Sequence, residues 1–220
     1  MCIRDSYYKS MAKKLNITMK LGKEVTAQEV LALKPYSILV ATGSNVISIP
    51  LEGLDQVQTV QAHDVLANDM QFANKKVVVI GGGITGLETA LYINRQGTNQ
   101  VSVVDMLPEW PVDMLDMRYQ NEALLEVRHC NDQGVALFYN NKVVKFADGK
   151  LFIESTKDGE VKELPADVIV LSVGVKPNDA LWQELLASGH PSVWKAGDAI
   201  ATGKINKAVL HGSKFGYSLN

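Results

Sequence analysis

The sequence predicts an α/β fold with a parallel sheet and an antiparallel β-meander, and three observations carry this prediction. Residues 77–80, Val-Val-Val-Ile, are β-branched in succession, as in a strand that is buried on both faces of a parallel sheet. Glycines follow this run directly, and an apolar stripe of helical spacing follows the glycines. A second apolar run over 101–104 ends in Asp105. This order is typical of a Rossmann-like βαβ unit.

The chain before this unit alternates helices with short strands. A Thr26-x-x-Glu29 capping box marks one helix start, and Pro35 marks the end of the same helix. The expected elements are, in order, a helix over 8–15, a strand over 17–19, a helix from 27 to 34, a strand over 37–43 that runs into a glycine, and a connector over 55–74 with one short helix.

The chain after the unit returns to short elements separated by polar turns such as Asn140-Asn141 and Asp148-Gly149. These turns indicate an antiparallel meander. The expected elements are a helix over 115–131, meander strands over 135–139, 142–146, 151–154 and 161–164, a buried strand over 168–173, a helix over 178–187, a strand over 192–195, a turn over 197–199 and a last helix over 206–218.

The glycine turn has the spacing of a site for a dinucleotide. In its fingerprint, Gly81 allows the tight turn, Gly83 allows a pyrophosphate to approach, and Gly86 allows close packing of helix on strand. The N–H groups and the positive end of the following helix would face the phosphates. The candidate cofactor-binding residues of the turn are Gly81, Gly82, Gly83, Ile84, Thr85 and Gly86.

Asp105 stands where a carboxylate can accept hydrogen bonds from both ribose hydroxyls. Met106, Leu107 and Pro108 supply no cation for a 2′-phosphate. The sequence therefore favours NAD(H) over NADP(H). A plain structural turn and an S-adenosylmethionine site, which also uses a glycine-rich turn and an acidic ribose ligand, remain as alternatives.

Composition excludes several classes of function. The 220 residues carry a formal net charge of −2, so we expect neither nucleic acid nor a membrane as a partner. There is no apolar run of about 18 residues and no signal-peptide pattern, so we expect a cytoplasmic protein. Cys2 and Cys130 are the only cysteines, which predicts no disulfide framework, metal site or iron–sulfur cluster within this chain. The four histidines are scattered, and no residue is predicted to be catalytic.

Four motifs in order resemble those of the two-dinucleotide-binding-domain flavoproteins, the superfamily that is similar to pyridine nucleotide-disulfide reductases. They are Val-Ala-Thr-Gly at 40–43, the glycine turn with Glu88, Leu-Ser-Val-Gly-Val-Lys-Pro-Asn at 171–178, and Ala-Gly-Asp-Ala at 196–199. Residues 103–109 and 173–178 more closely resemble the C-terminal region of the NADH:flavin oxidoreductase or 2,4-dienoyl-CoA (enoate) reductase family. The resemblance covers residues 7–220.

The resemblance implies a domain organisation and a reaction. Residues 7–74 would be a partial FAD-binding domain with a connector, 75–177 an inserted NAD(P)H-binding domain, and 178–220 the return to the FAD-binding domain. Family members pass electrons from NADH through FAD to a 4Fe-4S cluster and to FMN in an N-terminal barrel. The FMN then reduces an activated carbon–carbon double bond.

The resemblance also implies roles for single residues. Thr42 and Gly43 would pass near FAD, and Gly174 near NADH. Asp198, after Gly197, would accept a hydrogen bond from a ribityl hydroxyl, or else simply cap the chain before the last helix. The remaining implied residues are Glu88, near the nicotinamide amide and flavin or a plain surface glutamate, and Lys207 and Ala208, with N–H groups near the flavin pyrimidine oxygen.

The chain departs from the family pattern, because it has one glycine fingerprint and neither the barrel nor the cluster cysteines. We therefore expect a truncated fragment, inactive alone, whose residues 1–6 are a non-native leader. The FMN, the 4Fe-4S cluster and the barrel are expected only in the missing N-terminal part. Two alternatives remain: an isolated, non-catalytic NAD-binding module, and a pyridine nucleotide-disulfide reductase-type enzyme. The second needs a redox cysteine pair that is absent here and that, in that family, sits in the missing N-terminal region.

Overall fold

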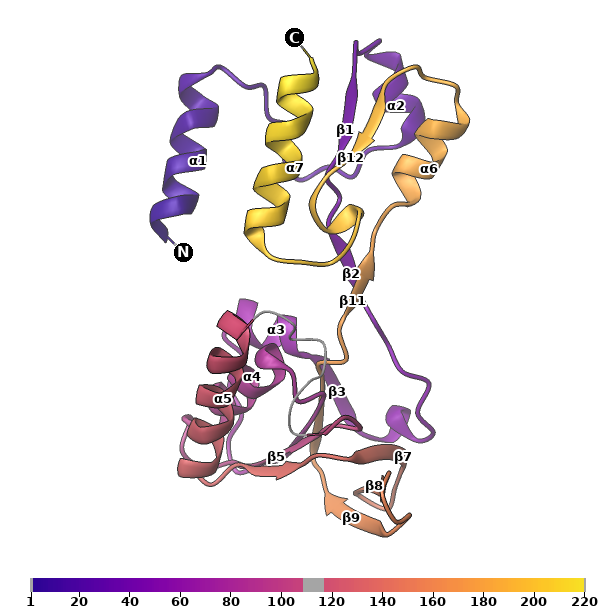
Figure 1. Ribbon diagram of the computed structural model, residues 1–220. Coiled ribbons are helices and arrows are strands. Elements are labelled where there is room, and N and C mark those ends of the chain that lie inside the picture. Colours follow the sequence, from indigo (N-terminus) through magenta and orange to yellow (C-terminus); the bar gives the residue numbers. More distant parts are fainter. Residues whose placement is uncertain (1, 109–116, 220) are drawn as a thin grey trace. The chain divides into compact units, whose positions relative to one another are not determined.

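The computed structural model describes residues 2–108 and 117–219 (Figure 1). The chain forms two compact units. Unit 1 comprises Met1–Gly43 and Pro177–Asn220, and unit 2 comprises Ser44–Lys176. Unit 2 is thus one continuous segment, inserted between the two segments of unit 1. Strands β2 (Ser44–Val46) and β11 (Val175–Pro177) lie where the chain passes from one unit to the other, and they form a two-stranded sheet.

Unit 2 is built on a five-stranded sheet in which every pairing is parallel. Its central strands are apolar because both faces of the sheet are covered, and this explains the β-branched runs in the sequence. In sheet order the strands are β3 (Gln58–Gln61), β10 (Val168–Leu171), β4 (Lys76–Ile80), β5 (Gln100–Val104) and β6 (Ala136–Phe138).

Alternate residues of the central strands face two different layers. Val77 and Val79 pack with residues of α3 (Ala62–Ala67), α4 (Ile84–Asn94) and α5 (Met117–Asp132). Val78 and Ile80 pack with Phe146, Leu151 and Ile153 of the antiparallel meander. The parallel sheet therefore lies between a helical layer and the meander of β7 (Asn141–Ala147), β8 (Lys150–Ser155) and β9 (Val161–Pro165) (Figure 1). This arrangement confirms the predicted α/β class.

Two predictions about unit 2 were wrong in detail. The segment 135–139 is not a meander strand, because β6 pairs parallel with β5 at the edge of the main sheet. The segment 55–74 is more than a connector: it contains the short helix η1 (Leu54–Gln56), the edge strand β3 and helix α3. Ala62 and Val65 are buried with β4 and α4, and the compact unit runs from Ser44 to Lys176. The limits of 75–177 for an NAD(P)H-binding domain stay a prediction.

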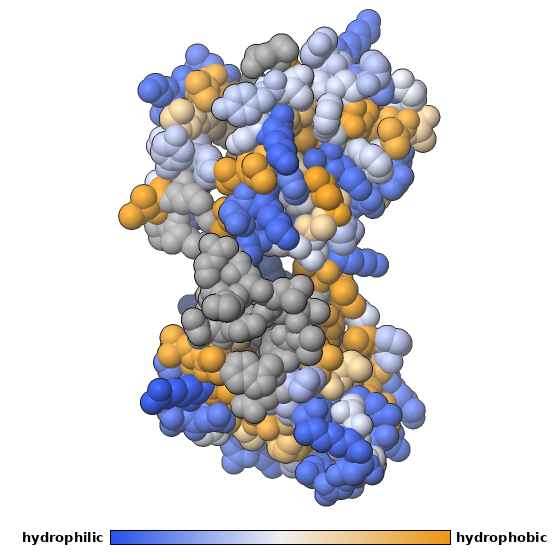
Figure 2. All heavy atoms as spheres, in the orientation of Figure 1, coloured by the Kyte–Doolittle hydropathy of each residue, from blue (hydrophilic) through white to orange (hydrophobic). Residues whose placement is uncertain are grey.

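Unit 1 has a smaller core. Strands β1 (Ile38–Val40) and β12 (Val193–Lys195) pair in parallel, and Ile38, Val40 and Leu185 are the buried residues of their apolar cluster. Apolar side chains of α7, such as Val209 and Leu210, remain about half exposed, and hydrophobic residues are visible on the surface in Figure 2. The helices of unit 1 are α1 (Cys2–Lys14), α2 (Ala27–Ala32), α6 (Ala180–Ala187) and α7 (Ile205–Ser218), with the short helix η2 (Gly197–Ala199).

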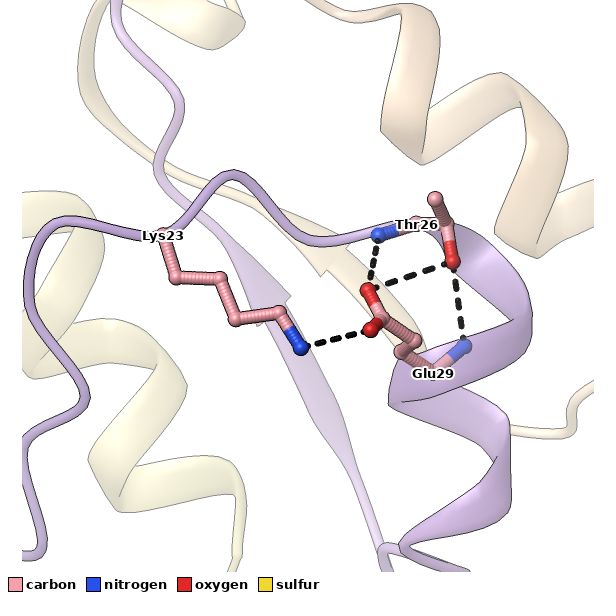
Figure 3. Close-up of polar contacts among 3 residues, drawn as sticks. All are labelled: Lys23, Thr26 and Glu29. Carbon is pink, nitrogen blue, oxygen red and sulfur yellow. Dashed lines mark hydrogen bonds and ion pairs between the residues drawn. The ribbon is translucent and has the colours of Figure 1, made fainter.

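The capping box that the sequence predicted opens α2 (Figure 3). The Glu29 N–H donates to Thr26 Oγ1 at 3.3 Å, and the Thr26 N–H donates to Glu29 Oε2 at 3.0 Å. Lys23 Nζ donates to the other carboxylate oxygen, Oε1, at 2.5 Å. These contacts hold the pKa of Glu29 below its usual value, first through the Lys23 hydrogen bond.

The start of unit 1 differs from the prediction. Helix α1 runs from Cys2 to Lys14, whereas the sequence predicted a helix over 8–15. Residues 17–19 form no strand, because Ile17 and Met19 are each 56% exposed and pair with no described strand. Asn16, with φ of 52°, turns the chain at the end of the helix.

Candidate functional site

The glycine turn lies where parallel strands β4, β5 and β10 have their carboxyl ends. Gly81 has φ of +110°, and a Cβ there would lie 2.2 Å from the Ser172 carbonyl oxygen. A Cβ at Gly86 would lie 1.9 Å from the Gly81 carbonyl oxygen. Neither position can hold a larger residue, because the neighbouring backbone occupies the space. Protein atoms therefore account for these two glycines without any ligand.

Gly83 is different from the other two. Among the residues that the structure describes, a Cβ at this position would meet nothing within 4 Å, and the backbone has an ordinary φ of −70°. Within the described part of the chain, the space beside Gly83 is therefore open, and neither a clash nor backbone strain requires a glycine there. A glycine at this position is explained if a ligand group, such as a pyrophosphate, approaches the backbone closely.

The first turn of α4 adds hydrogen-bond donors beside this open space. The helix has Gly83 as its N-cap, so no side chain caps it from that position. Its first backbone bond runs from the Leu87 N–H to the Gly83 carbonyl oxygen at 3.0 Å. The N–H groups of Ile84, Thr85 and Gly86 come before that bond and have no acceptor within the helix. The residues present thus fit an anionic phosphate group.

Asp105 lies at the carboxyl end of β5 and contacts the glycine turn directly. Its Oδ2 accepts the Gly82 N–H at 2.6 Å, and its Oδ1 accepts the Leu107 N–H at 2.8 Å. A carboxylate can accept about four hydrogen bonds, so capacity remains for ribose hydroxyls. Sequence reasoning gave Asp105 only the role of a ribose acceptor and missed that it orders the turn.

Tyr139 also lies against the turn, and sequence reasoning missed it. It follows β6, whose parallel neighbour β5 leads to Asp105. A Cβ at Gly82 would lie 2.9 Å from the Tyr139 ring and 3.2 Å from Asp105 Cβ. A glycine is therefore needed at position 82, because the side chains of Tyr139 and Asp105 occupy the space that a Cβ would take. The signal in the sequence was an aromatic residue directly after a strand, but its use required knowing that β6 pairs with β5.

The structure brings some of the other candidate residues of unit 2 to this edge of the sheet. The Ser172 N–H donates to the Ile80 carbonyl oxygen at 2.8 Å, so the segment leading to Gly174 begins beside the glycine turn. Gly174 itself is exposed, has φ of +95°, and accepts the Ile47 N–H at 3.1 Å. Glu88 is exposed on α4.

In unit 1, Thr42 and Gly43 form hydrogen bonds between the segment that leaves this unit and the segment that returns to it. Thr42 Oγ1 donates to the Asn178 carbonyl oxygen at 2.5 Å, and the Asn178 N–H donates to the Gly43 carbonyl oxygen at 3.0 Å. Gly43 has φ of +74°, a conformation that favours glycine. These contacts give both residues a structural role beside the one implied by the resemblance.

The Gly197–Asp198 turn packs against the start of α7. Asp198 Oδ1 accepts the Gly203 N–H at 3.0 Å, and the Gly197 N–H donates to Nδ1 of His211 at 3.2 Å. A Cβ at Gly197 would lie 3.4 Å from Ala208 Cβ. The Asp198 carboxylate is partly exposed and suited to accept a hydrogen bond from a hydroxyl group.

The N–H groups at the start of α7 differ from the expectation. The Lys207 N–H donates to Asn206 Oδ1 at 2.9 Å and to the Lys204 carbonyl oxygen at 3.0 Å. The Ala208 N–H donates to the same carbonyl oxygen at 3.5 Å. Both groups thus have acceptors within the chain, and a flavin oxygen would have to share or replace them.

Other side chains of the described residues provide neither a reactive thiol nor a metal site. Cys130 is fully buried, and burial raises the pKa of its thiol to about 11. Among the described residues, no three His, Cys, Asp or Glu side chains lie together as a metal site would need. In the same part of the chain, no helix combines the length and the apolar character needed to cross a membrane.

Comparison with known proteins decides the family. The profile described as pyridine nucleotide-disulphide oxidoreductase matches residues 4–212. The chain belongs to this family. Its members are flavin-dependent oxidoreductases that bind FAD and NAD(P)H. The parallel sheet with its glycine turn is therefore a Rossmann-like domain of the kind that this family uses.

Individual relatives are longer than this chain. Bilirubin reductase of Mediterraneibacter gnavus (strain CC55_001C) is 33% identical over 172 residues, which cover 78% of this chain and 26% of the relative. NADH oxidase of Thermoanaerobacter brockii is 30% identical over 211 residues, which cover 92% of this chain and 31% of the relative. A solved structure of 2-naphthoyl-CoA reductase has 27% identity and a TM-score of 0.81, with 96% of this chain and 31% of that chain covered. The chain spans about a quarter to a third of these proteins.

Proposed function

We propose that unit 2 binds NADH and that unit 1 carries part of an FAD site. In the longer protein, we propose, the two serve a flavin-dependent oxidoreductase that passes hydride from NADH to FAD. The observation that carries the proposal is the open space at Gly83, between the first turn of α4 and Asp105. Bound NADH supplies the hydride. Family membership supports the cofactor pair.

In this proposal the chain's residues bind and orient NADH. The N–H groups of the first turn of α4 donate to the pyrophosphate, and Gly83 lets it approach. Asp105, already fixed by Gly82 and Leu107, accepts the ribose hydroxyls. Its negative charge would repel a 2′-phosphate, which favours NADH over NADPH. Gly174 and Glu88 are proposed to lie near the nicotinamide end.

For the net reaction, we propose reduction of an activated carbon–carbon double bond of the enoate or dienoyl-CoA type. Relatives named as reductases of bilirubin and 2-naphthoyl-CoA support reduction over thiol–disulfide exchange. The FMN barrel and 4Fe-4S cluster would lie in the longer protein, outside these residues.

The test of the NADH site is titration calorimetry of the whole chain with NADH and with NADPH. The matched variants are Gly83→Ala, which puts a methyl group where the pyrophosphate would lie, and Gly216→Ala, an exposed change in α7. We expect saturable NADH binding, binding of NADPH weaker by roughly tenfold or more, and loss of binding in Gly83→Ala alone. Asp105→Ala is less informative, because it also removes the acceptor for the Gly82 N–H. A folded Gly83→Ala protein that binds NADH normally would overturn the proposal.

For FAD, Asp198 fits a ribityl hydroxyl, while the nearby N–H groups of Lys207 and Ala208 already have acceptors. The test is whether the chain, refolded with FAD and dialysed, keeps visible flavin absorbance. Retention that is lost in Asp198→Ala supports the FAD site. A colourless native protein that still binds NADH favours the alternative, a non-catalytic NAD-binding module.

A further inference from the structure

One hydrogen bond of unit 1 fixes the protonation state of a histidine. The Gly197 N–H lies 3.2 Å from Nδ1 of His211. A backbone N–H can only donate, so Nδ1 must accept with its lone pair. The contact therefore requires the neutral imidazole with its proton on Nε2. A protonated imidazole would place a second N–H against the Gly197 N–H and would break the contact.

The turn that this bond holds is the one that carries Asp198. Gly197 has φ of +60° and precedes Asp198 directly, and Ala199 on the far side is fully buried. The turn is fastened by the His211 acceptor at Gly197 and by the Gly203 N–H at Asp198 Oδ1. Loss of the first contact leaves the Gly197 N–H without this acceptor and frees one side of the turn.

We propose that His211 is a positioning residue that holds the Gly197–Asp198 turn through unprotonated Nδ1, so that acid releases the turn and weakens FAD binding there. The effect on FAD rests on the proposed function of Asp198. The effect on the turn does not, because it follows from the hydrogen bond alone. Nothing in the sequence pattern pointed to His211, which lies 14 residues from Gly197.

Other charged groups lie on α7 and on the elements packed against it. Within the described part of the chain, the elements packed on this part of α7 include η2 and, through the Trp194–Phe215 ring contact, β12. Their charged residues are Asp198 and Lys195, and Lys195 is paired with Asp179 at 3.0 Å. On α7 itself, Lys207 and Lys214 lie about one turn away from His211. Lysine and aspartate ordinarily keep their charge between pH 5 and 8, whereas histidine gains a proton there.

The experiment compares the native chain with His211→Asn and His211→Ala. Asparagine places Oδ1 where histidine has Nδ1, so it keeps the acceptor but cannot titrate in this range. The first readout, without FAD, is NMR of the 15N-labelled chain from pH 8 to pH 5, following the imidazole nitrogens and the protection of the Gly197 amide from hydrogen exchange. The second is FAD affinity by equilibrium dialysis at pH 8 and pH 5.5.

We expect unprotonated Nδ1 at pH 8 and a roughly tenfold loss of Gly197 protection on acidification of the native chain. His211→Asn should stay protected across the range, and FAD affinity should follow the same pattern. Protonated Nδ1 at pH 8, or an equal acid loss in His211→Asn, would overturn the proposal. If no form binds FAD at any pH, the FAD assignment fails, and the NMR readout still decides the role of His211. Since His211→Asn keeps the acceptor, the test stands even if His211→Ala does not fold.

Discussion

At the residue scale, the glycines of the turn have separable physical reasons. Gly86 is required by the fold, because a methyl group would lie 1.9 Å from the Gly81 carbonyl oxygen. Packing does not require Gly83, because a methyl group there would meet no atom of the described residues within 4 Å. A glycine at position 86 is thus explained by packing, and a glycine at position 83 by the approach of a ligand. A sequence fingerprint gives both the same weight, although only one carries information about binding.

We therefore predict that Gly86→Ala destabilises unit 2 by roughly 1–3 kcal/mol, the usual range for an overpacked site. Gly83→Ala should cost less, about 0.5–1 kcal/mol, because alanine is a poorer N-cap than glycine although its methyl group meets no described atom. Urea unfolding followed by circular dichroism measures both. Equal stability of the two variants would show that α4 can move away from the Gly81 carbonyl oxygen at little cost.

Cys130 gives a second prediction at this scale. Burial comes first among the causes that raise the pKa of its thiol to about 11, and the coulombic effect of Glu126 adds to it. At pH 8 only about one thiol in a thousand would then be ionised, and the thiolate is the reactive form. In a Cys2→Ser background, we expect no reaction with a thiol reagent in native buffer and full reaction in urea. Fast labelling of the folded protein would contradict this.

At the scale of elements, the capping box predicts a pH dependence in α2. The Lys23 hydrogen bond comes first among the causes that lower the pKa of Glu29 below 4.5 in the folded chain. Such a group stabilises the fold above its unfolded pKa, and this contribution is lost as pH falls through the folded pKa. We expect the exchange protection of α2 to drop below about pH 4.5 in the native chain but not in Glu29→Gln, which begins less protected. An acid loss of equal size in both would assign it to other groups.

The elements that sequence reasoning predicted well are those with local signals. The β-branched run of β4, the glycine turn and the capping box of α2 each act within a few residues, so the pattern alone identifies them. Strand β3 was missed because its sequence, Gln-Thr-Val-Gln, is polar. An edge strand needs little apolar surface, and only its pairing with β10 reveals it.

The candidate site divides in the same way. Gly83 and Asp105 could be found from spacing along the chain. The contacts of Asp105 with Gly82, of Tyr139 with Gly82 and of His211 with Gly197 could not, because they join segments 14 or more residues apart. Spacing predicts which residues face a nucleotide, whereas the residues that hold those residues in place depend on strand order and helix packing.

At the scale of the whole molecule, the two units have unequal cores. Unit 2 buries apolar side chains on both faces of its sheet. The apolar cluster of unit 1 has three buried residues, Ile38, Val40 and Leu185, with partly buried neighbours. Because apolar burial is the main source of stability, we expect unit 1 to open at lower free energy than unit 2.

Ligands should then protect the two units separately, and hydrogen exchange of the full chain measures this. A ligand at 100 times its Kd stabilises what it binds by about 2.7 kcal/mol, so exchange through unfolding slows roughly a hundredfold. If our assignment is right, NADH slows exchange in β4, β5 and β10 and leaves unit 1 unchanged. FAD, where it binds, slows exchange in β1, β12 and α7 and leaves unit 2 unchanged. Protection of β1 and β12 by NADH alone would contradict the assignment, because these strands belong to the unit that lacks the glycine turn.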